Sequence, residues 1–301
     1  MGSCGVRACL LEASSEKPGN VSPKRGFADT SYGDFLRGSR ALGPVLREAA
    51  LRGFGAGVGE ISLGGVGVGF LVKEAVNAVR KSHSGGNTHL GVSMLLVPLA
   101  AAAGLCASSG EGFAGLRLCL KKIVSATTVE DSLDLYDAIN MANPGGLGES
   151  ALDVRDGSSK EKIRRRGLTF IRLMGYSAGR DMVARELSLG MPVVFGFVVP
   201  NLERNLKKTK NQKKAITQTF LQTLAKHPDT LIARKTNPKK SRQITETAAK
   251  VLEAGGVYTK KGKAEIKEFD GQLRTQGNKL NPGTTADLIT AALYIHLLRN
   301  H

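Results

Sequence analysis

The chain has 301 residues, of which 41% are hydrophobic and 23% charged, so it can bury a large core and is not expected to be disordered. Its four cysteines are scattered and form no Cys-x-x-Cys pair, which argues against a zinc site or a disulfide framework and favours reduced thiols in a cytoplasmic protein. The net charge of +17 is concentrated in residues 201–280, which hold 19 Lys or Arg against 7 Asp or Glu and should attract anions.

Helix-forming residues dominate the chain. Alanine, leucine and glycine are abundant and alternating β-type patterns are rare, so we predict an all-α fold of roughly ten or more helices in a single domain over residues 1–301. Helices are predicted over 3–16, 32–52, 71–79, from 91 onward, near 111–124, 129–142, 163–189, 215–226, 241–254 and 284–298. Residues 192–199 are compatible with a strand or with a buried helix end.

Two unusual segments have plain structural interpretations. The uncharged stretch 90–107 is predicted to be a buried helix rather than a membrane span, because Ser, Gly and Pro98 interrupt it. Eight glycines lie within residues 53–69, but they match neither a dinucleotide-binding motif nor a P-loop. Close helix packing or a flexible turn is the better interpretation of this segment.

Polar residues stand where several apolar helices are predicted to begin. They are Asn87, Thr88 and His89, then Asp229, then Thr284 with Asp287. Backbone N–H groups at a helix start favour an anion, and a site for phosphate and magnesium needs such side chains. Each residue could instead serve only as a cap, since Asp229 occupies an N-cap position and Thr284 and Asp287 have capping-box spacing.

A further charged group lies in the predicted helix 163–189. Asp181, Arg185 and Glu186 are spaced so that they lie close together on one side of a helix. A surface ion pair explains this spacing as well as a functional cluster does.

Several motifs together resemble the triphosphoribosyl-dephospho-CoA synthase family, in the same order and across residues 12 to 298. They are Glu16-Lys17-Pro18-Gly19-Asn20-Val21 with Asp29 and Asp34 downstream, Gly86-Asn87-Thr88-His89-Leu90-Gly91, Asp229-Thr230-Leu231, the helix ending in Gly255-Gly256, and Asn281-Pro282-Gly283-Thr284-Thr285-Ala286-Asp287-Leu288. Leu90 stands where the family usually has Lys, and Asn143 to Gly148 stands in the family's central segment, so the chain resembles a divergent, archaeal-like branch.

The resemblance implies an all-helical enzyme that takes ATP with Mg²⁺, breaks the bond between ribose C1′ and adenine, and joins the triphosphoribosyl group to a ribose hydroxyl of 3′-dephospho-CoA. The altered central segment leaves another nucleotide or cofactor precursor open as the acceptor. A nucleic-acid-binding protein is the weaker alternative, because the basic segment lacks interleaved aromatic residues. No membrane partner is expected, and an oligomer remains possible.

The chemistry that the resemblance implies needs carboxylates near C1′, a base for the acceptor hydroxyl, and cations around the triphosphate. On that basis we predict catalytic roles for Asp34, His89 and Asp229, nucleotide binding by Lys17, Asn20, Asn87, Thr88, Thr230, Arg234, Lys235 and Thr284, and Mg²⁺ binding by Asp29, Asp181, Glu186 and Asp287.

Overall fold

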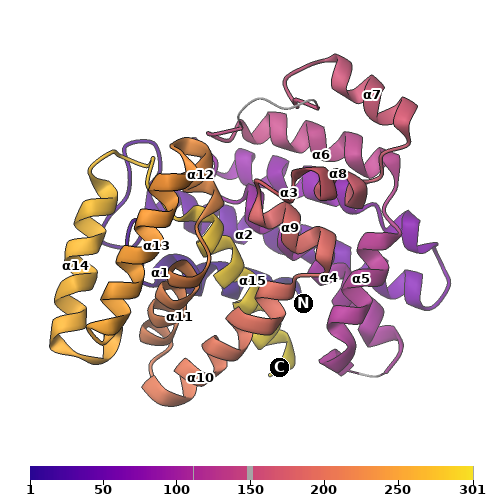
Figure 1. Ribbon diagram of the computed structural model, residues 1–301. Coiled ribbons are helices and arrows are strands. Elements are labelled where there is room, and N and C mark those ends of the chain that lie inside the picture. Colours follow the sequence, from indigo (N-terminus) through magenta and orange to yellow (C-terminus); the bar gives the residue numbers. More distant parts are fainter. Residues whose placement is uncertain (111, 148–151, 301) are drawn as a thin grey trace.

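The computed structural model describes residues 1–110, 112–147 and 152–300, and these residues form helices and connecting turns with no named strand (Figure 1). The helices are α1 (Gly2–Ser14), α2 (Tyr32–Gly57), α3 (Val68–Ser82), α4 (Leu90–Ser108), α5 (Leu116–Ser125), α6 (Val129–Ala142), α7 (Ser158–Arg166), α8 (Phe170–Ser177), α9 (Met182–Leu189), α10 (Val199–Thr209), α11 (Gln212–Lys226), α12 (Thr230–Lys235), α13 (Pro238–Glu253), α14 (Lys260–Arg274) and α15 (Gly283–Arg299). The predicted all-α fold is confirmed; the prediction of a single domain stays a prediction.

Helix α4 is the most apolar element and lies in the core. It packs against α2, α3, α5 and α15, and nearly all of its side chains are buried. By length and composition α4 is long enough to cross a membrane, as is the bent unit of α9 with the helical residues 194–209 taken as one span. Because most of α4 is enclosed by other helices, the predicted buried helix is confirmed.

The glycine-rich segment lets α2 and α4 approach each other closely. A side chain at Gly53 would overlap the carbonyl oxygen of Ala101, and one at Gly104 would overlap that of Ala50. Only glycine permits such close contact between two helix backbones. Helix α2 continues to Gly57, and the segment then passes through a short turn and the 3-10 helix Leu63–Val66 into α3, so close helix packing is the interpretation that the structure supports.

The second half of the chain differs from the prediction in several boundaries. The predicted helix 163–189 is divided into α7, α8 and α9, because Gly167 adopts a left-handed conformation and Asp181 starts a new helix as its N-cap. The strand interpretation of residues 192–199 is wrong, since Val194–Val198 is a π-helical turn that leads directly into α10. Helix α13 begins at Pro238 rather than at 241 because Asn237 caps it.

Helix α14 has no counterpart among the predicted helices. Its residues are mostly charged, and Phe269 and Leu273 are its only buried large side chains. An element that buries so little apolar surface gives only a weak periodic signal in the sequence.

The arrangement brings several helix N-termini together. Figure 1 shows α11, α13 and α14 on one side, α5 to α8 on the other, and α15 between them. Thr230 at the start of α12 accepts a hydrogen bond from the backbone N–H of Met182 in α9, and its hydroxyl lies 3.2 Å from that of Thr284 in α15. The starts of α9, α12 and α15 are therefore joined by side-chain hydrogen bonds.

Candidate functional site

Two cavities meet where α4, α12 and α15 begin. We call them the polar cavity and the apolar cavity, and both are lined by Asn87, Leu90, Gly91, Leu231 and Asp287. The polar cavity extends toward α1, the loop before α2 and the turn before α15, and its wall includes Glu12, Asn20, Asp29, Thr30, Thr88, His89, Lys235, Asn278 and Asn281. The apolar cavity extends among α6, α8 and α9, and its wall includes Met94, Leu135, Tyr136, Ile139, Leu173, Met174 and Val183 together with Asp153, Arg180, Asp181 and Arg234.

Asp287 lies at the junction of the two cavities. In the part of the chain that the structure describes, its carboxylate has no hydrogen-bond or ion-pair partner, and it does not form the capping box predicted with Thr284. Burial raises the pKa of Asp287 well above its ordinary value, and the negative charges of Glu12, Asp229 and Asp181 raise it further. The junction therefore favours a proton or a positive charge beside this carboxylate.

Gly91 makes room for the Asp287 carboxylate. Any side chain at position 91 would overlap the carboxylate oxygens of Asp287. The first turn of α4 can therefore lie directly against the start of α15.

A buried ion pair supports the polar cavity from α1. The Nζ of Lys17 lies 3.1 Å from a carboxylate oxygen of Glu12 and donates hydrogen bonds to the backbone carbonyls of Glu12, at 2.5 Å, and Ser15, at 2.8 Å. Burial raises the pKa of Glu12, and the charge of Lys17 opposes this shift. The three N–H donors of Lys17 are thus used within α1 and the following turn, which leaves none for its predicted nucleotide-binding role.

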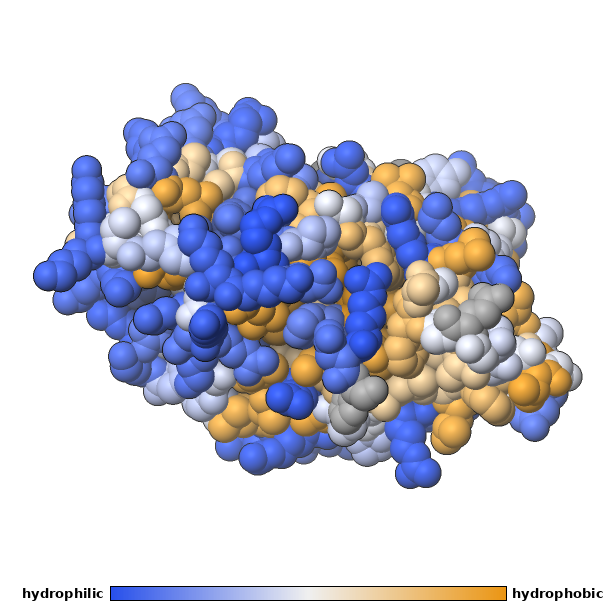
Figure 2. Space-filling view, turned by 90° about the horizontal axis from the view of Figure 1, so that it is seen from below, coloured by the Kyte–Doolittle hydropathy of each residue, from blue (hydrophilic) through white to orange (hydrophobic). Residues whose placement is uncertain are grey.

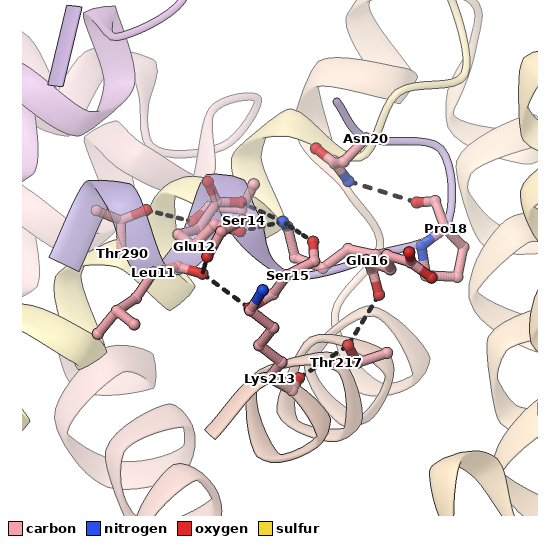
Figure 3. Close-up of polar contacts among 12 residues, drawn as sticks. Leu11, Glu12, Ser14, Ser15, Glu16, Pro18, Asn20, Lys213, Thr217 and Thr290 are labelled. Atoms are coloured by element: carbon pink, nitrogen blue, oxygen red, sulfur yellow. Dashed lines mark hydrogen bonds and ion pairs between the residues drawn. The ribbon is translucent and has the colours of Figure 1, made fainter. Parts of the chain in front are cut away.

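The turn that follows α1 is held by a hydrogen bond from α11 and also contributes to the wall of the polar cavity. Figure 3 shows Glu12, Asn20 and Thr290, which come from three separate segments and all line the polar cavity. The hydroxyl of Thr217 in α11 donates a 2.8 Å hydrogen bond to the carbonyl of Glu16. Asn20 lies at the cavity wall, and its side chain donates one long bond, 3.4 Å, to Pro18, while its predicted nucleotide-binding role stays a prediction.

A cation and a carboxylate mark the rim of the polar cavity. Lys235 donates a 3.0 Å hydrogen bond to the backbone carbonyl of Asn278, whose side-chain amide donates a 2.7 Å bond to Asp29. Burial lowers the pKa of Lys235, while the nearby charge of Asp29 raises it. Asp29 itself is exposed, so it remains accessible to a ligand.

His89 is held in one neutral form by its neighbours. The Ser39 hydroxyl donates to the carbonyl of Phe35, at 2.6 Å, and therefore accepts from Nε2 of His89, at 3.2 Å. Nδ1 of His89 then accepts from the hydroxyl of Thr88, at 2.6 Å. Both ring nitrogens are used within the protein, an arrangement that suits a residue positioning the cavity wall better than the predicted catalytic role. Asn87 accepts from the backbone N–H of Leu90 and so helps to start α4.

Acid is expected to destabilise the protein through His89. Burial lowers the pKa of His89 from 6.5 to about 3, and the charge of His83 acts in the same direction. As pH falls below 6.5, His89 binds a proton in the unfolded chain but not in the folded chain. The free energy of unfolding therefore decreases by up to about 1.4 kcal/mol per pH unit. Urea unfolding of wild type and His89→Gln at about pH 7 and about pH 5.5 tests this. The variant should depend less on pH, and equal pH dependence would contradict the prediction.

Asp181 and Arg234 form an ion pair on the wall of the apolar cavity. The other carboxylate oxygen of Asp181 caps α9 by accepting from the backbone N–H of Val183, at 2.8 Å. Neither Arg185 nor Glu186 joins this pair, so the predicted cluster of the three residues does not form. Arg234 lies close enough to Asp287 to lower its pKa, which places one positive charge near the junction.

Asp229 is a structural link rather than a free base. One carboxylate oxygen accepts from the backbone N–H groups of Leu231 and Ile232, at 2.9 and 3.1 Å. The other accepts from the backbone N–H and the hydroxyl of Thr285, at 2.7 and 2.8 Å. The residue is the predicted N-cap of α12, and it also joins α12 to α15, but its predicted catalytic role has no free oxygen to support it.

Two other predicted carboxylates also serve local structure. Both oxygens of Glu186 accept backbone N–H groups, from Val193 at 3.1 Å and Val194 at 2.8 Å, and the residue is fully buried away from both cavities. Asp34 forms a capping box with Ser31 at the start of α2. Across residues 1–110, 112–147 and 152–300, no group of three His, Cys, Asp or Glu side chains is arranged to hold a metal ion.

The predicted site residues thus divide into two sets. Those lining the cavities are Asn20, Asp29, Asn87, Thr88, His89, Asp181, Arg234, Lys235, Thr284 and Asp287, whereas Lys17, Asp34, Glu186, Asp229 and Thr230 support them from outside. Sequence analysis missed Glu12, Asn278 and Arg180. A charged residue within the apolar stretch 8–13 was the available signal for Glu12. Gly148 of the altered central segment lies outside the described residues.

Curated relatives resemble the chain along nearly its whole length. It is 25% identical over 300 residues to the "Probable 2-(5''-triphosphoribosyl)-3'-dephosphocoenzyme-A synthase" of Pseudomonas putida, an alignment that covers 98% of this chain and 93% of the relative. It is 27% identical over 305 residues to a protein of the same name from Streptococcus equi subsp. zooepidemicus, with 98% and 95% covered.

A solved structure and a family profile agree with these relatives. A solved structure titled "Crystal structure of putative triphosphoribosyl-dephospho-coA synthase from Archaeoglobus fulgidus" matches with a TM-score of 0.62 and 22% identity, covering 88% of this chain and 98% of that chain, which supports the fold. The profile described as ATP:dephospho-CoA triphosphoribosyl transferase matches residues 1–301. The chain therefore belongs to the ATP:dephospho-CoA triphosphoribosyl transferase family.

Proposed function

We propose that this protein transfers the triphosphoribosyl group of ATP to a ribose hydroxyl of 3′-dephospho-CoA and releases adenine. The observation that carries the proposal is the meeting of two cavities at the carboxylate of Asp287. A transferase must hold two substrates with their reacting atoms in contact, and such positioning can supply about 7–11 kcal/mol of the barrier reduction. A cytoplasmic location fits an enzyme that uses these two substrates.

The two cavities suit different parts of the substrates. The polar cavity offers amide groups of Asn20 and Asn87 and the cation of Lys235, which match the ribose hydroxyls and phosphates of ATP. The apolar cavity offers aliphatic walls with Arg234 near its inner end. We assign it to the acceptor, whose uncharged pantetheine arm fits apolar walls and whose pyrophosphate fits a guanidinium.

Asp287 is the proposed general base. The acceptor hydroxyl oxygen forms a bond to C1′ while the bond from C1′ to adenine breaks, and adenine leaves with the electron pair of that bond. Asp287 takes the hydroxyl proton, and its raised pKa suits a proton acceptor. The positive charge that develops at C1′ is stabilised by the carboxylates of Asp287, Glu12 and Asp181 around the junction.

Magnesium fits the rim of the polar cavity better than the junction. Asp29 is exposed there beside Lys235, and Mg²⁺ in proteins is often held by one or two carboxylates together with substrate phosphates. A site of this kind needs no preformed group of three protein ligands. The ion would neutralise charge on the triphosphate, and Asp29 is the residue proposed to hold it.

The proposal is tested by measuring free adenine released from ATP and Mg²⁺ with and without dephospho-CoA. We expect release to require dephospho-CoA, and expect ADP, which carries the same nucleoside diphosphate without the pantetheine arm, to be a poorer acceptor. Release that ignores the acceptor would contradict a transferase. Release with another nucleotide or cofactor precursor but none with dephospho-CoA would favour the alternative acceptor.

A further inference from the structure

A strongly basic groove, separate from the two cavities, lies on the opposite side of the turn that lines the polar cavity. Its walls come from the N-terminal half of α11, from α14 between Lys263 and Arg274, and from the loop after α1, and its apolar lining includes Pro18, Val257 and Ile266. Figure 2 shows hydrophilic side chains covering most of the side of the molecule where α11, α13 and α14 lie in Figure 1. The proposed reaction uses none of the groove's exposed cations.

The acidic residues in this groove are already paired. Glu16 lies 2.7 Å from Lys24, and Asp270 lies 2.9 Å from Arg25 and from Arg274. Cations of the loop and of the C-terminal part of α14 are therefore neutralised by neighbours.

Four lysines in the same groove have no such partner. They are Lys213 and Lys214 in α11 and Lys263 and Lys267 in α14, all exposed and without an ion pair to any residue that the structure describes. They face one concave surface from two helices, so their repulsion is not relieved by the protein itself. The charge excess of residues 201–280 is thus gathered in part at a single surface groove.

The positions of these lysines within their helices add to the positive field. Lys213 and Lys214 lie in the first turn of α11, and Lys263 lies near the start of α14, where no acidic residue occurs in the first turn. The N-terminus of a helix carries a partial positive charge, so cations placed there are unfavourable unless an anion lies nearby. Four lysines from two helices, three of them near helix N-termini, therefore line one groove.

We propose that this groove binds an oligophosphate group, such as the di- or triphosphate of a phosphorylated metabolite, at a site separate from the two cavities. Several phosphate oxygens match several lysines on facing walls, because each ammonium provides donors without a fixed direction. The apolar lining accommodates the uncharged part of such a ligand. The buried Lys17 lines this groove while pairing with Glu12 of the polar cavity, so the two sites share the turn after α1.

Inorganic tripolyphosphate is the probe. Binding to the full chain is measured by calorimetry for wild type, for a groove variant with Lys213, Lys214, Lys263 and Lys267 changed to Gln, and for a control variant with the exposed Lys81, Lys122, Lys239 and Lys250 changed to Gln. Both variants lose the same charge. We expect the groove variant to lose one binding event or to weaken it by about tenfold or more, and the control to stay within about twofold.

Location is read independently from amine-reactive labelling of wild type followed by mass spectrometry. Tripolyphosphate should protect Lys213 and Lys263 while leaving Lys122 reactive. Equal weakening in both variants, or equal protection of all three lysines, would show attraction by net charge alone and overturn the proposal. Adenine release should be unchanged in the groove variant, so failure of this site and failure of the proposed transferase reaction are distinguished.

Discussion

Replacing Asp287 by Asn is expected to lower acceptor-dependent adenine release by about 10²- to 10⁴-fold, the range that loss of a general base produces. The amide has the size of the carboxylate but cannot take the hydroxyl proton. Folding should be retained or improved, because the substitution removes a charge that Glu12, Asp181 and Asp229 repel. Adenine release, together with urea unfolding of the same preparation, measures both effects.

The matched control for this variant is Asp153→Asn. Asp153 lines the apolar cavity but not the polar cavity, and its carboxylate is held by Arg155. We expect its loss of kcat to be small, while any change appears in the KM for the acceptor. If Asp287→Asn kept wild-type kcat, or if both variants lost kcat equally, Asp287 would not be the base. Loss of Mg²⁺-dependent ATP binding in Asp287→Asn would instead assign it to the metal.

Asp229→Ala should be the most destabilising of the carboxylate substitutions. The change removes the N-cap of α12 and leaves buried donors of Leu231, Ile232 and Thr285 without partners. An N-cap alone contributes about 1 kcal/mol, and hydrogen bonds to a charged group contribute about 1.5–3 kcal/mol each, so we expect a loss of about 3–5 kcal/mol. Urea unfolding monitored by helical circular dichroism provides the measurement.

Asn237→Ala is the control for this loss of a cap. Asn237 caps α13 but is exposed, and its side chain accepts a single hydrogen bond, from the backbone N–H of Lys240. Its removal should cost about 1 kcal/mol. Similar losses in the two variants would mean that the link between α12 and α15 contributes little. If the Asp229→Ala protein is folded at low temperature but has no activity there, Asp229 would again be a candidate catalytic residue.

Local signals were enough to locate most of the helices. The turn after α1, the apolar length of α4 and the Asn281-Pro282-Gly283 start of α15 depend on residues that are neighbours in the chain. Helix α14 was missed because a helix that lies on the surface and is mostly charged lacks the apolar period. The division of 163–189 into three helices was not predicted. The helical spacing of apolar residues continues across Gly167 and Asp181, so it does not reveal that one helix ends at Gly167 and another begins after Asp181.

The fold class, the family resemblance and the set of polar residues that begin the apolar helices could all be predicted from the amino-acid sequence. Only the tertiary structure separated Asp229 from Asp287, two aspartates near the starts of two helices. Asp229 meets donors of another helix, so its oxygens are consumed, whereas Asp287 meets Gly91 and two cavities, so its oxygens stay available. That difference depends on how α4, α12 and α15 pack together. Contacts between segments that are distant in the chain cannot be predicted from the spacing of neighbouring residues.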